Sequence, residues 1–239
     1  MLRYRLEYAK KDFARFLSHL ELLRTFNRVF RRSALPLSFT RGFSPRPKIS
    51  FGPPLPVGAA GLREYLDFEL VEAVPPRKGL ELLARQLPAG LVAGQLAVLP
   101  PGAPGLSKFL DCAWYQVALL HCQADAGAWR QVLRELTGGT SPWLYRRNGS
   151  GTVYDVKAGV KEARIVTGRN SFLHLLVNTG SREIPLRVIL EVLWEKAAVP
   201  CPPLPAQVTR VGLFRRQSGD LVTPLGDVTS FQEKVCEGK

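Results

Sequence analysis

Residues 16–58 read FLSHLELLRTFNRVFRRSALPLSFTRGFSPRPKISFGPPLPVG, and this stretch says most about the fold and function of the chain. Near its start, Ser18 and Glu21 have the spacing of a capping box. In that motif the serine hydroxyl accepts from a backbone amide three residues on, and the glutamate reaches back to the amide of the serine. The pattern predicts a helix from Ser18 to about Ala34.

The predicted helix has two chemically different faces. At about 100° per residue, one side collects the apolar side chains and should pack on a sheet. These are Leu22, Leu23, Phe26, Val29 and Phe30. The other side collects Arg24, Arg28, Arg31 and Arg32. Such arginines fit either a merely solvated face or a phosphate contact. The second interpretation is favoured, because like charges at helical spacing repel one another in the free helix.

A loop dense in proline and basic residues follows the helix. Residues 35–40 predict a short extended segment, and residues 41–48 read RGFSPRPK. Prolines fix φ and restrict the preceding residue, so this loop should lose little entropy on binding. Phe43, between a glycine and a serine, is the best candidate for stacking on a base. We predict a nucleic-acid-binding site formed by Arg24, Arg28, Arg31, Arg32, Arg41, Phe43, Arg46 and Lys48.

The charge of the chain is concentrated in the same region. Residues 1–50 hold twelve Lys/Arg and three Asp/Glu, a net +9 out of +13 for all 239 residues. Together with a pI near 10.0, this favours an acidic partner, either nucleic acid or an anionic membrane surface. The alternative interpretation is a basic protein that has no acidic partner. Hydrophobic residues make up 46% of the chain, enough for a globular core.

Alternating and helical patterns predict the order of elements in the first half. Residues 2–8 (LRYRLEY) and 64–72 (EYLDFELVE) alternate between apolar and polar, which is typical of half-buried strands. A helix should start at Pro75-Pro76, and residues 91–99 should form another strand. With the extended segment after the first helix, the order is strand, helix, strand, strand, helix, strand, as in the ferredoxin-like split βαβ unit.

The second half repeats this order more loosely. Residues 100–107 contain PPGAPG and predict a linker. We expect strands at 109–120, 143–146, 152–156, 171–178 and 208–216, helices at 126–136 and 184–194, and irregular chain at 161–164. The predicted fold class is therefore α+β, with two tandem ferredoxin-like (split βαβ) domains, 1–99 and 108–239, built on antiparallel sheets.

The stretch from Arg15 to Gly58 resembles the radical-SAM-linked protein family, a bacterial domain of unknown function found beside or fused to a cobalamin-type radical SAM protein. Weaker points of resemblance to the family are EYLDFEL at 64–70, YDVK at 154–157 and RVGLF at 210–214. Arg46 stands where the family often has histidine, which weakens a catalytic or metal-binding role there and leaves phosphate binding intact. The resemblance implies co-operation with a radical SAM enzyme that modifies RNA. This chain lacks C-x-x-x-C-x-x-C, so the radical chemistry would belong to the partner.

Three functions follow from these patterns. The favoured one is an RNA-binding accessory protein that presents tRNA or rRNA to a partner radical SAM enzyme. The second is a metal-independent endoribonuclease of the tandem ferredoxin-like type with His19 as the base. The helical wheel places His19 beside Phe26 and Phe30, which favours a packed histidine. The third is a protein-interaction adaptor of a radical SAM enzyme without RNA contact. Enzymatic activity is left open, with binding favoured.

The remaining ionisable residues predict no metal and no cofactor. The cysteines, Cys112, Cys122, Cys201 and Cys236, have no metal-ligand spacing, and His121 and His174 lack an accompanying carboxylate cluster. There is no signal-peptide pattern, and no apolar run approaches the roughly 20 residues of a membrane span. We therefore expect a cytoplasmic protein with reduced thiols, and the sequence leaves its oligomeric state open.

Overall fold

The computed structural model describes residues 1–119, 126–146, 151–167, 171–180, 183–198 and 208–231. The first half contains β1 (Leu2–Lys10), a 3-10 turn η1 (Asp12–Phe16), α1 (His19–Arg32), β2 (Ile49–Phe51), β3 (Ala60–Leu70), α2 (Pro76–Ala84) and β4 (Leu91–Val98). The second half contains α3 (Leu106–Phe109), β5 (Cys112–Ala118), α4 (Ala126–Gly138), β6 (Leu144–Arg146), β7 (Val153–Asp155), α5 (Val156–Gly159), β8 (Val160–Val166), β9 (Phe172–Asn178), α6 (Leu186–Lys196), β10 (Val208–Gln217), β11 (Asp220–Val222) and β12 (Val228–Thr229).

The predicted capping box forms at the start of α1. The Ser18 hydroxyl accepts from the Glu21 amide at 3.3 Å, and the Glu21 carboxylate accepts from the Ser18 amide at 2.8 Å. The apolar face of α1 is buried against β1 and β3, with Phe26 between Tyr8 and Phe51. The helix therefore forms where its cap and its apolar stripe predict it.

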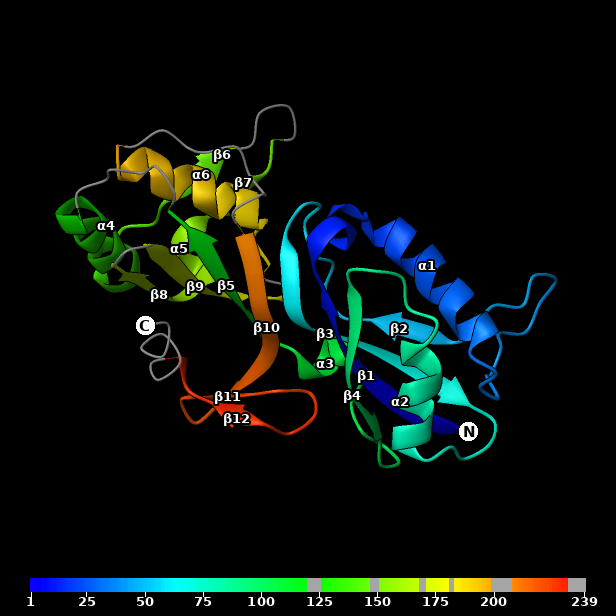
Figure 1. Ribbon diagram of the computed structural model, residues 1–239. Helices are drawn as coiled ribbons and strands as arrows, with labels where there is room; N and C mark the ends of the chain where they lie inside the picture. Colours follow the sequence, from blue (N-terminus) through cyan, green and yellow to red (C-terminus); the bar gives the residue numbers. More distant parts are fainter. Residues whose placement is uncertain (120–125, 147–150, 168–170, 181–182, 199–207, 232–239) are drawn as a thin grey trace.

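A single, mostly antiparallel sheet runs through the molecule. Its strand order is β4-β1-β3-β10-β5-β9-β8, and β2 pairs with part of β3. The first-half strands lie in the order β4-β1-β3-β2 and the second-half strands in the order β10-β5-β9-β8. Helices α1 and α2 pack on the first group, and α4 and α6 pack on the second (Figure 1). The α+β class is confirmed, and the division into two ferredoxin-like domains stays a prediction.

The two halves share that sheet, which the sequence did not predict. Strands β3 and β10 pair in parallel, with Thr209 opposite Ala60 and Arg210 opposite Gly61. The predicted linker is hydrogen-bonded to the first half, because the buried Arg5 donates to the Pro104 carbonyl at 3.1 Å. Elements 150 residues apart in the chain are thus hydrogen-bonded neighbours.

The structure corrects two predicted elements and one predicted boundary. Residues 35–40, expected to supply the second strand, form only isolated bridges at Leu37 and Phe39, and the second strand is β2. Residues 161–164, expected to be irregular, belong to strand β8 at the end of the sheet order. The strand expected from Phe109 begins at Cys112, because residues 106–109 form the short helix α3. Strands β11 and β12 were not predicted, and they extend β10 as a small antiparallel addition.

Candidate nucleic-acid interface

The outward face of α1 carries four arginines. Arg24, Arg28, Arg31 and Arg32 are all exposed, while Phe26 and Val29 on the opposite face are fully buried. Arg32 turns toward the second helix and donates to the Gln86 carbonyl at 3.2 Å. The other three lie at helix positions i, i+4 and i+7, so they follow one line over about 10 Å of helix.

Residues 38–48 form an arm that projects beyond the C-terminal end of α1 (Figure 1). Its two sides are joined at the base, because the Lys48 amide donates to the Ser38 carbonyl at 2.9 Å and the Thr40 amide donates to the Arg46 carbonyl at 2.9 Å. Pro47 is buried at this base, whereas residues 41–46 are exposed. The loop that the sequence singled out is therefore a projecting arm.

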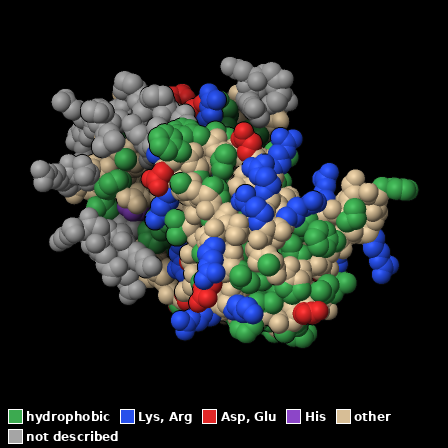
Figure 2. Space-filling view, turned by 45° about the vertical axis from the view of Figure 1, so that its right-hand side comes forward, with side chains coloured by type: hydrophobic (Ala, Val, Ile, Leu, Met, Phe, Trp, Pro, Cys, Tyr) green, Lys and Arg blue, Asp and Glu red, His purple; other side chains and the backbone are tan. Residues whose placement is uncertain are grey.

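A groove of about 790 Å³ lies between α1 and the base of the arm. Its cationic side chains come from both segments, namely Arg24, Arg28, Arg31, Arg46 and Lys48. Its remaining lining residues are Leu20, Leu23, Asn27, Thr40, Pro47 and Ile49, so no carboxylate of the described residues lines it. Arg31 reaches across and donates to the Pro45 carbonyl at 3.4 Å. In Figure 2 blue Lys and Arg side chains gather beside the projecting arm and on it.

Most of these cations lack an ion-pair partner, although the Glu21 carboxylate attracts Arg24 electrostatically. Within the described part of the chain, none of the four α1 arginines, nor Arg41 or Arg46, forms an ion pair. Lys48 is the exception, since its Nζ lies 2.9 Å from the Glu69 carboxylate. The groove is thus a concave cationic surface whose charge is available to an anionic ligand.

The structure brings together five of the eight predicted site residues. Arg32, Arg41 and Phe43 do not line the groove. Phe43 is fully exposed in the arm, and the neighbouring Gly42 has φ of +130° with open space around it. That backbone conformation favours glycine, so Gly42 explains how the arm turns.

His19 lies on the other side of α1 from the groove, at the start of the helix. Its ring packs edge-on against Phe51 with 5.8 Å between the ring centres. It borders a cavity of about 10 Å³, which it shares with Tyr8, Lys10 and Glu64. This volume accommodates about one water molecule. That cavity therefore does not admit a phosphodiester.

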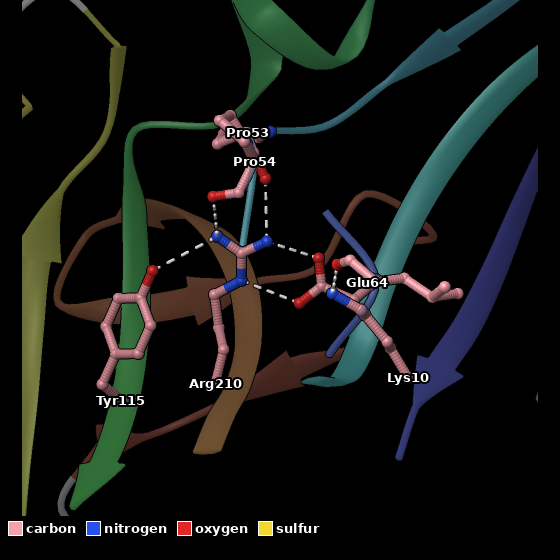
Figure 3. A network of polar contacts seen from close by, with 7 residues as sticks. Lys10, Pro53, Pro54, Glu64, Tyr115 and Arg210 are labelled. Carbon is pink, nitrogen blue, oxygen red and sulfur yellow. Dashed lines mark hydrogen bonds and ion pairs between the residues drawn. The ribbon is translucent and has the colours of Figure 1, made fainter. Parts of the chain in front are cut away.

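A buried network of charged residues lies next to that cavity, and the sequence did not reveal it (Figure 3). The Arg210 guanidinium pairs with Glu64 through two nitrogens, one of them at 2.7 Å. It also donates to the carbonyls of Pro53 and Pro54 at 2.8 and 3.2 Å and to the Tyr115 hydroxyl at 3.2 Å. Burial alone would lower the pKa of Arg210, but Glu64 raises it, so the guanidinium stays charged.

Lys10 lies on the other side of Glu64 and is also buried. Its Nζ donates to the Leu17 carbonyl at 2.6 Å, which ties β1 to the start of α1. Burial lowers the pKa of Lys10, although the nearby Glu64 carboxylate acts in the opposite direction. Since Arg210 and Lys10 come from opposite ends of the chain, only the folded protein brings their charges to the same carboxylate.

Neither a metal centre nor a membrane-spanning helix occurs among the described residues. No group of three His, Cys, Asp or Glu is placed to hold a metal ion there, and no helix there combines the length and apolarity needed to cross a bilayer. Cys112 is a buried free thiol, and burial raises its pKa. The predicted positions Cys122, Cys201, Cys236 and His121 lie outside the described residues.

A family model described as "Uncharacterized protein conserved in bacteria (DUF2344)" matches residues 3–185. The chain belongs to this family. The matched region of DUF2344 contains α1, the arm and all eight predicted site residues. The description does not mention a radical SAM enzyme, so that link stays an implication of the resemblance. No curated protein matches the chain.

Two solved structures are among those found to be similar to this DUF2344 chain. One is a Cbf5-Nop10-Gar1 complex, with 13% identity, a TM-score of 0.44, and coverage of 90% of this chain and 49% of that one. The other is an archaeal box H/ACA sRNP Nop10-Cbf5 complex, with 13% identity, a TM-score of 0.42, and coverage of 90% and 48%. The chain spans about half the length of these two matched chains. Similarity at this level carries no inference about function.

Proposed function

We propose that this DUF2344 protein binds RNA in the groove between α1 and the arm, and that it presents the RNA to a partner radical SAM enzyme. The observation that carries the proposal is the convergence of Arg24, Arg28 and Arg31 from α1 with Arg46 and Lys48 from the arm on one groove without a carboxylate. Arginine suits this role because its planar fork binds phosphate oxygens in pairs.

The charge distribution supports a polyanionic ligand. Exposed arginines at i and i+4 repel each other, and nearby carboxylates would normally relieve that repulsion. Arg24 and Arg28 have no ion-pair partner among the described residues. A phosphate backbone would supply the missing negative charge and would release its own counterions on binding.

The burial of the apolar face of α1 favours RNA over an anionic membrane surface as the ligand. An amphipathic helix that binds a membrane surface needs its apolar face free to enter the lipid. Here Phe26, Val29 and Phe30 are buried in the core, and only the arginine face is exposed. A concave groove also fits a nucleic-acid backbone better than a flat anionic surface.

A matched pair of double variants tests the binding site. Arg24→Gln with Arg28→Gln removes two charges from the groove. Arg130→Gln with Arg134→Gln removes the same charge at the same i, i+4 spacing from the exposed face of α4. In fluorescence anisotropy with a labelled structured RNA, the groove variant should bind about tenfold or more weakly, and the α4 variant should bind like the wild type. Equal weakening of both variants, or no binding by the wild type at about 50 mM salt, contradicts the proposal.

The radical SAM partner is tested separately. The tagged protein should retain the partner enzyme when it is purified from its native host, and nuclease treatment should reduce that retention if RNA bridges the two proteins. Retention that nuclease does not change favours the adaptor without RNA contact. A preparation that contains RNA but never the enzyme contradicts the partner proposal and leaves RNA binding standing.

The endoribonuclease alternative lacks a favourable geometry. His19 packs against Phe51 and borders a cavity of about 10 Å³. Incubation of labelled RNA with the pure protein in EDTA decides the question, with His19→Ala as the control. We expect intact RNA. Cleavage by the wild type that the variant lacks would establish the enzyme instead.

A further inference from the structure

The arm presents an aromatic ring that the rest of the protein does not contact. Phe43 is fully exposed, and a side chain added at Gly42 would meet nothing within 4 Å. A phenylalanine that stays in water gains no free energy from burial, so the place of Phe43 in the arm adds nothing to the stability of the fold. Such a ring is available for an intermolecular contact.

Hydrogen bonds fix the base of the arm, and residues 41–46 beyond it are exposed. Two backbone hydrogen bonds, from Thr40 to Arg46 and from Lys48 to Ser38, join its sides. A bridge between Phe39 and Pro47 lies between them. Arg46 and Lys48 line the groove from this base, so the position of the arm is coupled to the groove. A ligand held in the groove therefore lies beside the arm that carries Phe43.

The class of RNA follows from what Phe43 can contact. In a continuous A-form duplex the base faces are stacked on one another, and the deep, narrow major groove does not admit side chains. Unpaired bases in loops and bulges can stack on an aromatic ring instead. A uniform duplex thus offers phosphates to the groove and nothing to the ring.

We propose that this protein selects RNA with an unpaired base beside a stem, stacking that base on Phe43 while the groove holds the phosphates of the stem. This inference rests on the proposed RNA binding. Arg41 and Arg46 flank the ring, and neither has a carboxylate partner among the described residues. Their charge suits a nucleotide, whose phosphate lies next to the stacked base.

The inference is tested with two RNA probes of equal length, a stem-loop and a fully paired duplex. The variants are Phe43→Ala and Phe43→Trp. The control is Phe13→Ala, which removes a ring that is 90% exposed on η1 and does not line the groove. We expect Phe43→Ala to weaken stem-loop binding about 5- to 100-fold, and Phe43→Trp to preserve it. Duplex binding should be weaker than stem-loop binding in the wild type and unchanged by all three variants.

A fluorescent base gives a second readout. 2-Aminopurine in the loop should be quenched when wild-type protein binds and much less quenched by Phe43→Ala at saturating protein. Equal binding of stem-loop by wild type and Phe43→Ala, with equal quenching, overturns the inference. If the groove variant then still loses affinity, RNA binding survives alone. If the wild type binds neither probe, the proposed function falls as well.

Discussion

At the residue scale, the most deeply buried ion pairs join residues far apart in the chain. Glu64 and Arg210 are 3% and 1% exposed, and the arginine reaches three further groups beyond the carboxylate. Because 146 residues separate the two, no sequence pattern indicates the pair. Prediction from sequence depends on local periodicity, which identified the surface arginines of α1 and missed the buried one in β10.

Removing one member of the buried Glu64–Arg210 pair should greatly lower the free energy of unfolding. Glu64→Gln leaves the charge of Arg210 buried without its counter-charge, which typically costs about 3–5 kcal/mol. Glu69→Gln serves as the control, since its pair with Lys48 is about one-third exposed on both sides and should contribute less than about 1 kcal/mol. Urea denaturation measures both changes. Equal losses for the two variants would contradict the account of the network.

His174 should make the protein sensitive to acid. It is buried, its Nδ1 accepts from the Trp114 indole at 3.1 Å, and burial lowers its pKa to about 4. The unfolded state then takes up a proton below about pH 6.5, and the folded state takes it up only near pH 4. The stability that depends on neutral His174 is complete above about pH 6.5. It is lost as the pH falls to about 4, by roughly 3 kcal/mol.

The check for His174 is the unfolding free energy at pH 7 and pH 4.5. His174→Gln can still accept from the indole and does not titrate. It should therefore lose less stability than the wild type between these two values. An identical loss in both proteins would assign the acid sensitivity to other groups.

At the element scale, α1 shows what sequence can predict and why. Its cap, its apolar stripe and its arginine face are all local features, and each occurs in the structure, except that Leu23 lines the groove and does not join the buried stripe. Strand β8 was missed for a physical reason. It lies at the end of the strand order and all of its residues are only partly buried, so VKEARIV lacks a clear alternation. The groove forms only where α1 and the arm come together in the fold. The sequence predicted the helix and the loop separately, and it did not predict the groove between them.

The contribution of the capping box at the start of α1 to the stability of the protein should be measurable. Ser18→Ala removes the hydroxyl that satisfies the Glu21 amide, and such changes cost about 1 kcal/mol. Ser44→Ala on the exposed arm is the matched control and should change stability very little. Thermal unfolding followed by circular dichroism compares them. A Ser18→Ala protein with wild-type stability would show that packing alone fixes the helix start.

At the scale of the whole molecule, the continuous sheet and the buried arginines hold the two halves together. Arg5 in β1 donates to carbonyls of both Pro104 and Pro224, and Arg63 in β3 pairs with Glu7 and with Asp227. The sequence indicated two units and a linker, and it did not indicate these ties. They give α1 and the arm a fixed support, which a preformed binding groove requires.

The central claim is that the groove binds a polyanion through its unpaired arginines, and the salt dependence of RNA affinity tests it most directly. For wild-type protein, log K should fall steeply and linearly with log salt, because each phosphate contact releases counterions. Arg24→Gln with Arg28→Gln should reduce that slope by roughly 1.5, the value for two lost contacts. A flat slope for the wild type, or a slope that the double variant leaves unchanged, would contradict the account.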